Sequence, residues 1–293
     1  MNGSTGKLAA LETPSGKGAG DENFPVGSFL LPRRLRPHVA RYYAFARAID
    51  DIADNPALAD DDKVARLGAF ADAIHGKAGG PGLEKAMRLR ESLLETKVPL
   101  RHASDLTVAF IQDARKSRYA DWRDLMGYCE NSANPVGRYL LALHGETDPA
   151  AYAASDALCS ALQVLNHLQD CGDDYRNLDR VYLPQDWIAA EGARTEELGG
   201  KALTPALRIV LDRTLTATDE LLAGARALAG LLSPRRLAME SAAIWRIARR
   251  LSALLKAADP LAGRVKLSKT QFLACGLGGS LAATLRIAEG RRP

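Results

Sequence analysis

A chain of 293 residues with 47% hydrophobic and 25% charged side chains has a globular composition, which excludes disordered, fibrous and membrane-embedded classes. The formal net charge of +4 is too small and too dispersed for a dedicated nucleic-acid binder, which gathers Lys and Arg on one surface. The four cysteines form no CxxC pair and have no metal-like spacing to a histidine, so we expect reduced thiols rather than a disulfide framework.

The N-terminal residues 1–21 are rich in Gly, Ser and Thr and contain no apolar core of a secretory signal, which predicts a flexible tail. No apolar run reaches the roughly 18–20 residues that cross a bilayer. We therefore expect a cytoplasmic protein whose membrane contact, if it has any, is peripheral and at the inner face. Basic residues at positions 33, 34, 36, 246, 249 and 250 would suit an anionic lipid surface, although solvated surface charge is the commoner case.

Apolar residues recur at three- and four-residue spacing along most of the chain, with no alternating strand pattern, and this predicts an all-α fold. Ser104 and Asp121, the latter followed by Asp124 three residues on, are expected to precede and cap helices. No shift in composition divides the chain, so we expect a single domain over residues 22–293. The predicted helices span residues 36–54, 61–75, 83–97, 105–117, 122–130, 135–144, 154–175, 204–231, 234–257 and 270–287.

Residues 41–54, RYYAFARAIDDIAD, place polar groups along one face of the first predicted helix. Carboxylates one turn apart repel each other, and burying them without a cation costs several kcal/mol per ion. Mg²⁺ removes this difficulty because it takes one or two carboxylates and bridges them to phosphate oxygens. We expect a metal site with an arginine donor beside it, formed along the stripe of Tyr43, Arg47, Asp50, Asp51 and Asp54.

Residues 163–174, QVLNHLQDCGDD, form a second stripe of the same kind, with Gln163, Asn166, Asp170 and Asp174 spaced i, i+3, i+7 and i+11. We interpret His167 as lying off this stripe and serving packing rather than metal binding. One such motif is usually a solvated surface, but two of them among apolar residues favour a functional site. Two such helices that face each other would hold a Mg²⁺ cluster around one diphosphate and promote ionisation of an allylic or cyclopropylcarbinyl substrate.

Several motifs together resemble the squalene/phytoene synthase family. They are YxxxRxxDDxxD from Tyr43 to Asp54, QxxNxxxDxxxD from Gln163 to Asp174, and RVYLP at residues 180–184. Residues 118–119, 128–129 and 136–137 match as well, and the resemblance runs over nearly the whole chain, residues 23–286. It implies the single-domain isoprenoid synthase fold, with both Asp-rich helices facing a central hydrophobic cavity, Mg²⁺ dependence and prenyl diphosphate substrates.

The resemblance also implies roles for individual residues. Tyr43 and Tyr128 match pocket tyrosines suited to proton transfer or cation stabilisation. Arg47 and Asn166 would assist the diphosphate. The remaining implied sites are substrate binding at Asn23, Phe24, Asn134, Gln163, Gln169 and Arg180, and metal binding at Asp50, Asp51, Asp54, Asp170 and Asp174.

Departures from the usual family pattern favour one branch, the hydroxysqualene synthases (HpnC type) of bacterial hopanoid biosynthesis. Asn23-Phe24 stands where Ser-Phe is usual, Asn134 lies in ANPVG where AGxVG is usual, and Gln169 replaces an arginine. Phe24 is expected at the mouth of the pocket. The amides of Asn134 and Gln169 would suit a group that positions a quenching water. Asn134 before Pro135 suits a helix start equally well.

This branch implies conversion of presqualene diphosphate to hydroxysqualene by ionisation, carbocation rearrangement and water capture. It also implies coupling to a presqualene diphosphate synthase upstream and a hydroxysqualene reductase downstream. The alternative is a head-to-head prenyltransferase that joins two farnesyl or geranylgeranyl diphosphates, for which the same metal site is expected. A non-catalytic assembly protein is the third reading, but such a relative would be expected to lose metal carboxylates, and this chain retains both motifs.

Overall fold

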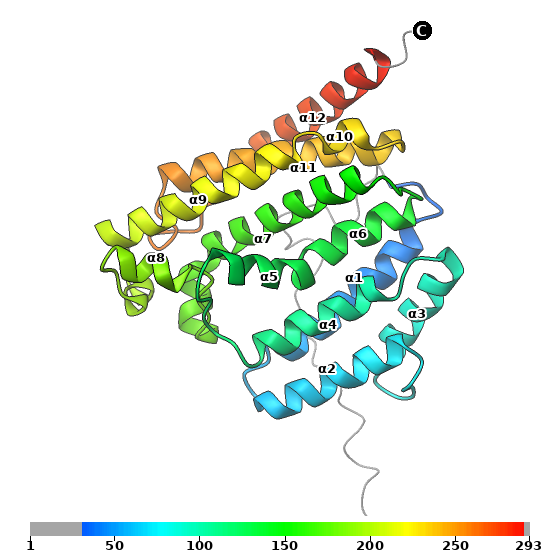
Figure 1. Cartoon of the computed structure of the whole chain (residues 1–293), viewed down its shortest axis with the longest axis horizontal. Helices are drawn as coiled ribbons and strands as arrows, with labels where there is room; N and C mark the ends of the chain where they lie inside the picture. The colour runs from blue at the N-terminus through cyan, green and yellow to red at the C-terminus, as the bar shows by residue number, and fades with distance from the viewer. Residues whose placement is uncertain (1–30, 290–293) are drawn as a thin grey trace, which may run out of the picture. The chain divides into compact units, whose positions relative to one another are not determined.

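The computed structural model describes the backbone of residues 31–289, with side chains described as far as residue 281 except at residue 280. Helices account for all the regular structure of this part of the chain, beside one isolated bridge between Arg118 and Val181, as the all-α prediction requires (Figure 1). The helices are α1 (Arg36–Ala53), α2 (Asp60–Ile74), α3 (Glu84–Thr96), α4 (Arg101–Asp113), α5 (Trp122–Ser132), α6 (Asn134–Leu143), α7 (Pro149–Leu178), α8 (Gln185–Ala190), the 3-10 helix η2 (Thr195–Gly199), α9 (Pro205–Ala225), α10 (Leu228–Leu231), α11 (Arg235–Ala257) and α12 (Lys269–Glu289).

The described helices gather into two compact units, which divide the chain between Lys116 and Ser117. In the first unit, α1 and α2 pack against each other and against α3 and α4. In the second unit, α7 packs against α5, α6, α9, α10 and α11, and α12 packs along α11. The expectation of one domain over residues 22–293 stays a prediction.

The two helices that carry the aspartate motifs bury one face and leave the polar stripe on another. On α1, Val39, Phe45, Ile49 and Ile52 are buried. On α7 the buried face includes Leu158, Ala161, Val164, Leu165 and Leu168. Burial of these apolar residues, spaced three and four apart, orients each helix and so determines where its polar stripe points.

The helix boundaries confirm some sequence expectations and correct others. The Asp121 side chain caps α5, with its Oδ1 accepting a 2.8 Å hydrogen bond from the Asp124 backbone N–H. The Ser104 cap is wrong, because α4 begins at Arg101 and Ser104 lies inside its first turn. The single helix predicted over 204–231 is broken into α9 and α10, and the sequence did not predict α8 or η2.

Three expectations concern the N-terminal segment or membrane insertion. The tail predicted at residues 1–21 and the candidate residues Asn23 and Phe24 lie outside the described part of the chain. Among the described residues, no helix combines the length and hydropathy that crossing a bilayer requires.

Candidate active site

The polar stripe on α1 forms as the sequence predicts. Tyr43, Arg47, Asp50, Asp51 and Asp54 are all half-buried, in contrast to the fully buried apolar face of the same helix. Helical spacing alone brings these side chains together, because residues three and four apart are neighbours on a helix surface.

Arg47 pairs with the aspartates on its own helix. Its Nη1 donates to Asp50 Oδ2 at 2.6 Å, and its Nη2 donates to Asp51 Oδ1 at 3.2 Å. The guanidinium thereby offsets the repulsion between the neighbouring Asp50 and Asp51 carboxylates. The arrangement supplies three carboxylates and one strong phosphate donor on a single helix face.

The second stripe lies on α7, where Gln163, Asn166, Asp170 and Asp174 are half-buried while the residues between them are mostly buried. His167 also belongs to this face, so the interpretation that it lies off the stripe is wrong. Its Nε2 lies 2.9 Å from Gln163 Nε2, and its Nδ1 lies 3.6 Å from Asp174 Oδ2. Helical spacing explains the correction, since His167 is four residues after Gln163 and seven before Asp174.

The partners of His167 indicate which tautomer its neutral ring adopts. An amide nitrogen is only a donor, so in this orientation Gln163 donates to His167 Nε2, and in the neutral ring the proton sits on Nδ1. That N–H faces the Asp174 carboxylate. His167 therefore lies between the Gln163 amide and the Asp174 carboxylate, a candidate metal ligand, and can orient that carboxylate.

An aromatic cluster lies beside this stripe. The His167 ring stacks on Tyr182, with 3.3 Å between centroids and 12° between planes. Tyr128, buried as a pocket tyrosine would be, lies 5.6 Å from Tyr182 and 5.4 Å from Tyr119, centroid to centroid. The ring faces offer a surface of the kind that stabilises cations.

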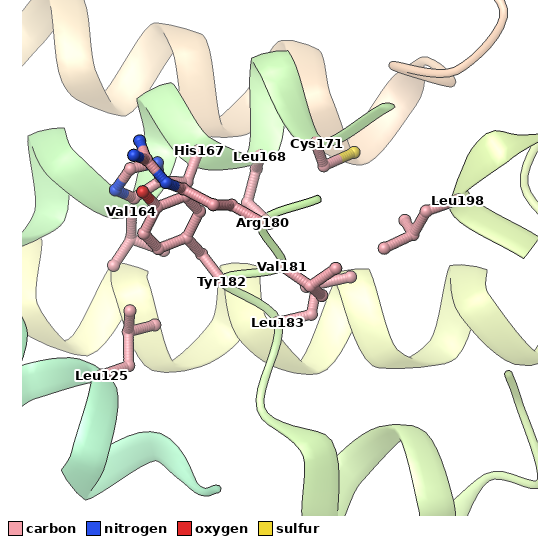
Figure 2. Close-up of a pocket in the computed structure, with 10 residues that line it drawn as sticks. All are labelled: Leu125, Val164, His167, Leu168, Cys171, Arg180, Val181, Tyr182, Leu183 and Leu198. Carbon is pink, nitrogen blue, oxygen red and sulfur yellow. The ribbon is translucent and has the colours of Figure 1, made fainter. Parts of the chain in front are cut away.

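The segment 180–184 runs past α7 and holds part of this cluster in place. Val181 N–H donates to the Ser117 carbonyl at 2.9 Å, and Arg180 N–H donates to the Asp174 carbonyl at 3.1 Å. Arg180 and Tyr182 are both buried, and Figure 2 shows them with His167 at one end of a pocket whose other end holds Leu198. The pocket volume of about 10 Å³ suits roughly one water molecule, so it is not a prenyl-chain cavity.

A loop before α12 contacts the second motif, which the sequence did not predict. Gln169 Nε2 donates to the Val265 carbonyl at 2.5 Å, and Arg264 Nε lies 3.8 Å from Asp170 Oδ1. No spacing rule connects residues so far apart in the sequence. Arg264 therefore joins the candidate site as a further cation, and the buried Gln169 amide holds the loop that carries it.

The Asn134 side chain also has a structural partner. Its Oδ1 accepts a 2.9 Å hydrogen bond from the hydroxyl of Ser160, and both side chains are buried between α6 and α7. The expectation that Asn134 and Pro135 start a helix is confirmed, because α6 begins at Asn134 and Pro135 lies in its first turn; the N-cap is Ala133, and Asn134 makes no side-chain cap. Its role in positioning a water, like that of Gln169, stays a prediction.

The electrostatics of Asp170 indicate a site that favours a cation. Burial, aided by the neighbouring Asp174 and Asp173 carboxylates, raises the pKa of Asp170, and Arg264 only partly offsets this effect. No group of three or more His, Cys, Asp or Glu side chains surrounds a single point anywhere in the described residues. Asp170 and Asp174, one turn apart on α7, are oxygen donors of the type and number by which Mg²⁺ is held in proteins.

Comparison with known proteins assigns the family. Residues 18–271 match the family model described as squalene/phytoene synthase. The chain belongs to that family. It is 41% identical over 285 residues to a protein named hydroxysqualene synthase from Rhodopseudomonas palustris, covering 97% of both chains.

Two further relatives carry related names. A hydroxysqualene synthase from Sinorhizobium fredii is 41% identical over 271 residues, covering 92% of each chain. The solved structure titled squalene synthase HpnC from Alicyclobacillus acidocaldarius is 32% identical, with a TM-score of 0.71 over 82% of this chain and 90% of that one. The isoprenoid synthase fold expected from the motifs is therefore confirmed.

Proposed function

We propose that this protein is a hydroxysqualene synthase that converts presqualene diphosphate and water to hydroxysqualene and diphosphate. One observation carries the proposal: identity of 41% to proteins with this name extends over nearly the full length of both partners. The two carboxylate stripes on α1 and α7 support it, because the reaction needs a site for a diphosphate leaving group.

The aspartates of each motif would hold Mg²⁺: Asp50, Asp51 and Asp54 at the C-terminal end of α1 and, separately, Asp170 and Asp174 on α7. When bound, the ion would neutralise the diphosphate and make it a better leaving group. Arg47 would add a bidentate donor to phosphate oxygens, and its present pairing with Asp50 and Asp51 keeps the guanidinium at that face of α1.

The rest of the chemistry needs no redox partner. The carbon–oxygen bond breaks with its electron pair on the departing diphosphate, and the resulting carbocation rearranges. A water oxygen then bonds to the cationic carbon and loses one proton to the released diphosphate or to solvent. On α7, Asn166 and Gln163 would donate to phosphate oxygens, with His167 orienting Gln163 and Asp174. Tyr43 and the buried ring of Tyr128 would stabilise the cation, and Arg180 would bind substrate.

The chemistry of this reaction indicates which enzymes must act before and after it. A presqualene diphosphate synthase must supply the substrate, and a hydroxysqualene reductase would consume the alcohol. A substrate with long apolar chains partitions into lipid, so we also propose that the enzyme works in contact with the inner face of the membrane.

The proposal is tested by a product assay with Mg²⁺ and no NADPH, in which presqualene diphosphate and farnesyl diphosphate are offered separately. Hydroxysqualene from the first substrate, with the second left unconsumed, is the expected result. Presqualene diphosphate formed from farnesyl diphosphate would instead assign the protein to the condensing branch. Strict dependence on NADPH would also overturn the proposal.

A further inference from the structure

The outer face of α12 exposes large apolar side chains to solvent. Leu273, Leu277 and Leu281 are 61%, 64% and 61% exposed, and they follow at i, i+4 and i+8 along one line of the helix. We call these three residues the α12 leucine row. The other exposed large hydrophobic residues of the described chain are Phe272, next to this row, and the dispersed Met87, Leu94, Val108, Val136 and Ile209.

The opposite face of α12 is already used for packing on α11, along which it runs in Figure 1. A Cβ added at Gly279 would lie 2.5 Å from the Cα of Ala243, and one at Gly278 would lie 2.8 Å from Nη1 of Arg246. Gly279 permits this close approach, because a Cβ there would meet the backbone of α11, whereas the flexible end of Arg246 near Gly278 can move aside. The helix therefore cannot rotate to bury the leucine row without losing its contact with α11.

The charge around the row favours an anionic partner. Residues 260–288 contain no Asp or Glu and four basic residues, Arg264, Lys266, Lys269 and Arg286. Lys266 and Lys269, immediately before the row, are exposed. An apolar row preceded by basic residues, with Glu289 at the far end of the helix as its one acidic residue, is the pattern of a helix that lies in the interface of an anionic bilayer.

The row is also continuous with the candidate active site. The loop that leads into α12 contacts the second motif through the Gln169–Val265 hydrogen bond and the Arg264–Asp170 pair. Leu261 of the same loop lies against Gly172 of α7. A short loop thus connects α12 to Asp170 in the second motif. The proposed substrate of that motif carries its diphosphate on long apolar chains, which reside in lipid.

We propose that the α12 leucine row is the surface by which this protein lies on an anionic lipid bilayer. A bilayer is favoured over a second copy of the chain as the partner that covers the row. A second copy would place its own basic residues against Lys266 and Lys269. The reason for visiting the membrane rests on the proposed function, but lipid binding itself does not.

Vesicle co-sedimentation of the full chain tests the proposal, without substrate or metal. Vesicles of phosphatidylcholine mixed with phosphatidylglycerol are compared with vesicles of phosphatidylcholine alone. The wild type is expected to bind the mixed vesicles. A triple variant, Leu273→Gln, Leu277→Gln and Leu281→Gln, is expected to bind the mixed vesicles at least about tenfold more weakly. The reason is that the burial of three leucine side chains in lipid is lost.

The matched control removes three apolar side chains elsewhere that are also more than half exposed. Leu94, Val108 and Ile209 are 52%, 51% and 51% exposed, and Leu94→Gln, Val108→Gln and Ile209→Gln together are expected to leave binding unchanged. A second arm, Lys266→Gln with Lys269→Gln, is expected to weaken binding to the mixed vesicles several-fold. If the triple variant fails to fold, Leu277→Gln is compared with Ile209→Gln in the same way.

Three outcomes would overturn the proposal. One is no sedimentation of the wild type with either vesicle, and another is equal binding by the leucine variant and its control. The third is a wild-type dimer in light scattering that the leucine variant dissociates, because the row would then be covered by a second copy. Since no substrate is present, failure of the proposed enzyme activity would leave these results unchanged.

Discussion

His167 shows at the scale of single residues how the second motif is organised. The ring contacts Gln163 on one side, Asp174 on the other and Tyr182 on its face. A side chain with three defined contacts has one orientation, so it holds its partners in place as well. Asp170 has a nearby cation outside α7, the exposed Arg264 from the loop before α12, and His167 on α7 is a weaker favourable influence on its charge.

We expect Asp170→Asn to make the fold more stable and to lower turnover strongly. The pKa of Asp170 is raised in the folded protein, so its ionised form destabilises the fold. This destabilisation appears as pH rises above the pKa of the unfolded chain and is complete above the pKa of the folded protein. The Tm at pH 7 should therefore rise, while the rate falls about a hundredfold or more through loss of a metal ligand. Thermal denaturation and product analysis measure the two effects.

Asp173→Asn is the matched control for that prediction. Asp173 lies on the same helix but is exposed and paired with Arg176. Normal activity in both variants would contradict the metal assignment of Asp170.

At the scale of helices, α6 and α7 approach each other closely at Gly137. A Cβ added there would lie 2.5 Å from Ser155 Oγ and 2.6 Å from Cys159 Sγ, both on α7. The Asn134–Ser160 hydrogen bond lies along the same contact. Close packing at one position and a buried hydrogen bond at the next thus determine how these two helices cross.

Gly137→Ala is expected to lower the free energy of unfolding by about 1–3 kcal/mol, because the added methyl group overpacks the α6–α7 contact. Gly127→Ala on α5 is its control. Gly127 has nothing within 4 Å of an added Cβ, so alanine there should raise stability by about 0.5–1 kcal/mol. Urea denaturation compares the two variants, and equal effects would contradict the packing argument.

A second link between elements is Glu146, in the loop between α6 and α7. Its Oε1 accepts hydrogen bonds from the N–H groups of Thr147 and Asp148 at 3.0 and 3.2 Å, and its Oε2 accepts one from Ser233 at 3.2 Å. Burial alone would raise the pKa of this carboxyl, but the three backbone donors lower it below its ordinary value.

A carboxyl with a lowered pKa stabilises the fold above its unfolded pKa and loses that contribution as pH falls through its folded pKa. Glu146→Gln should therefore cost about 1–2 kcal/mol at pH 7 and progressively less on acidification. Denaturant titrations at pH 7 and at pH 4 measure the difference, and a penalty that is the same at both would contradict a role for the charge.

For the whole molecule, each of the two compact units contains one aspartate motif, α1 in the first and α7 in the second. The family match spans both units, from residue 18 to residue 271. The proposed chemistry needs both motifs, so activity is expected to be a property of the complete chain rather than of either unit.

Mg²⁺ added together with inorganic pyrophosphate should stabilise the complete chain. A ligand at about a hundred times its Kd adds about 2.7 kcal/mol, which for a protein of this size raises the Tm by about 5–10 °C. Either component alone should have a smaller effect, and Asp170→Asn should reduce the shift. Differential scanning calorimetry measures it, and an unchanged Tm with both components present would argue against the proposed site.

The sequence by itself determined the features that depend on short-range spacing. Periodicity predicted most helices, and helical geometry placed Tyr43, Arg47 and the aspartates on shared faces, because residues three and four apart are neighbours on any helix. The ordered motifs determined the family and its fold.

Only the tertiary structure decided the contacts between residues far apart in the chain. Arg264 beside Asp170, Gln169 bonded to Val265, Asn134 bonded to Ser160 and the exposure of the α12 leucine row depend on which helices pack together. A pattern within one helix reports which face is apolar, but not which neighbour covers it or whether any does. Burial and long-range hydrogen bonds arise only when that packing is complete.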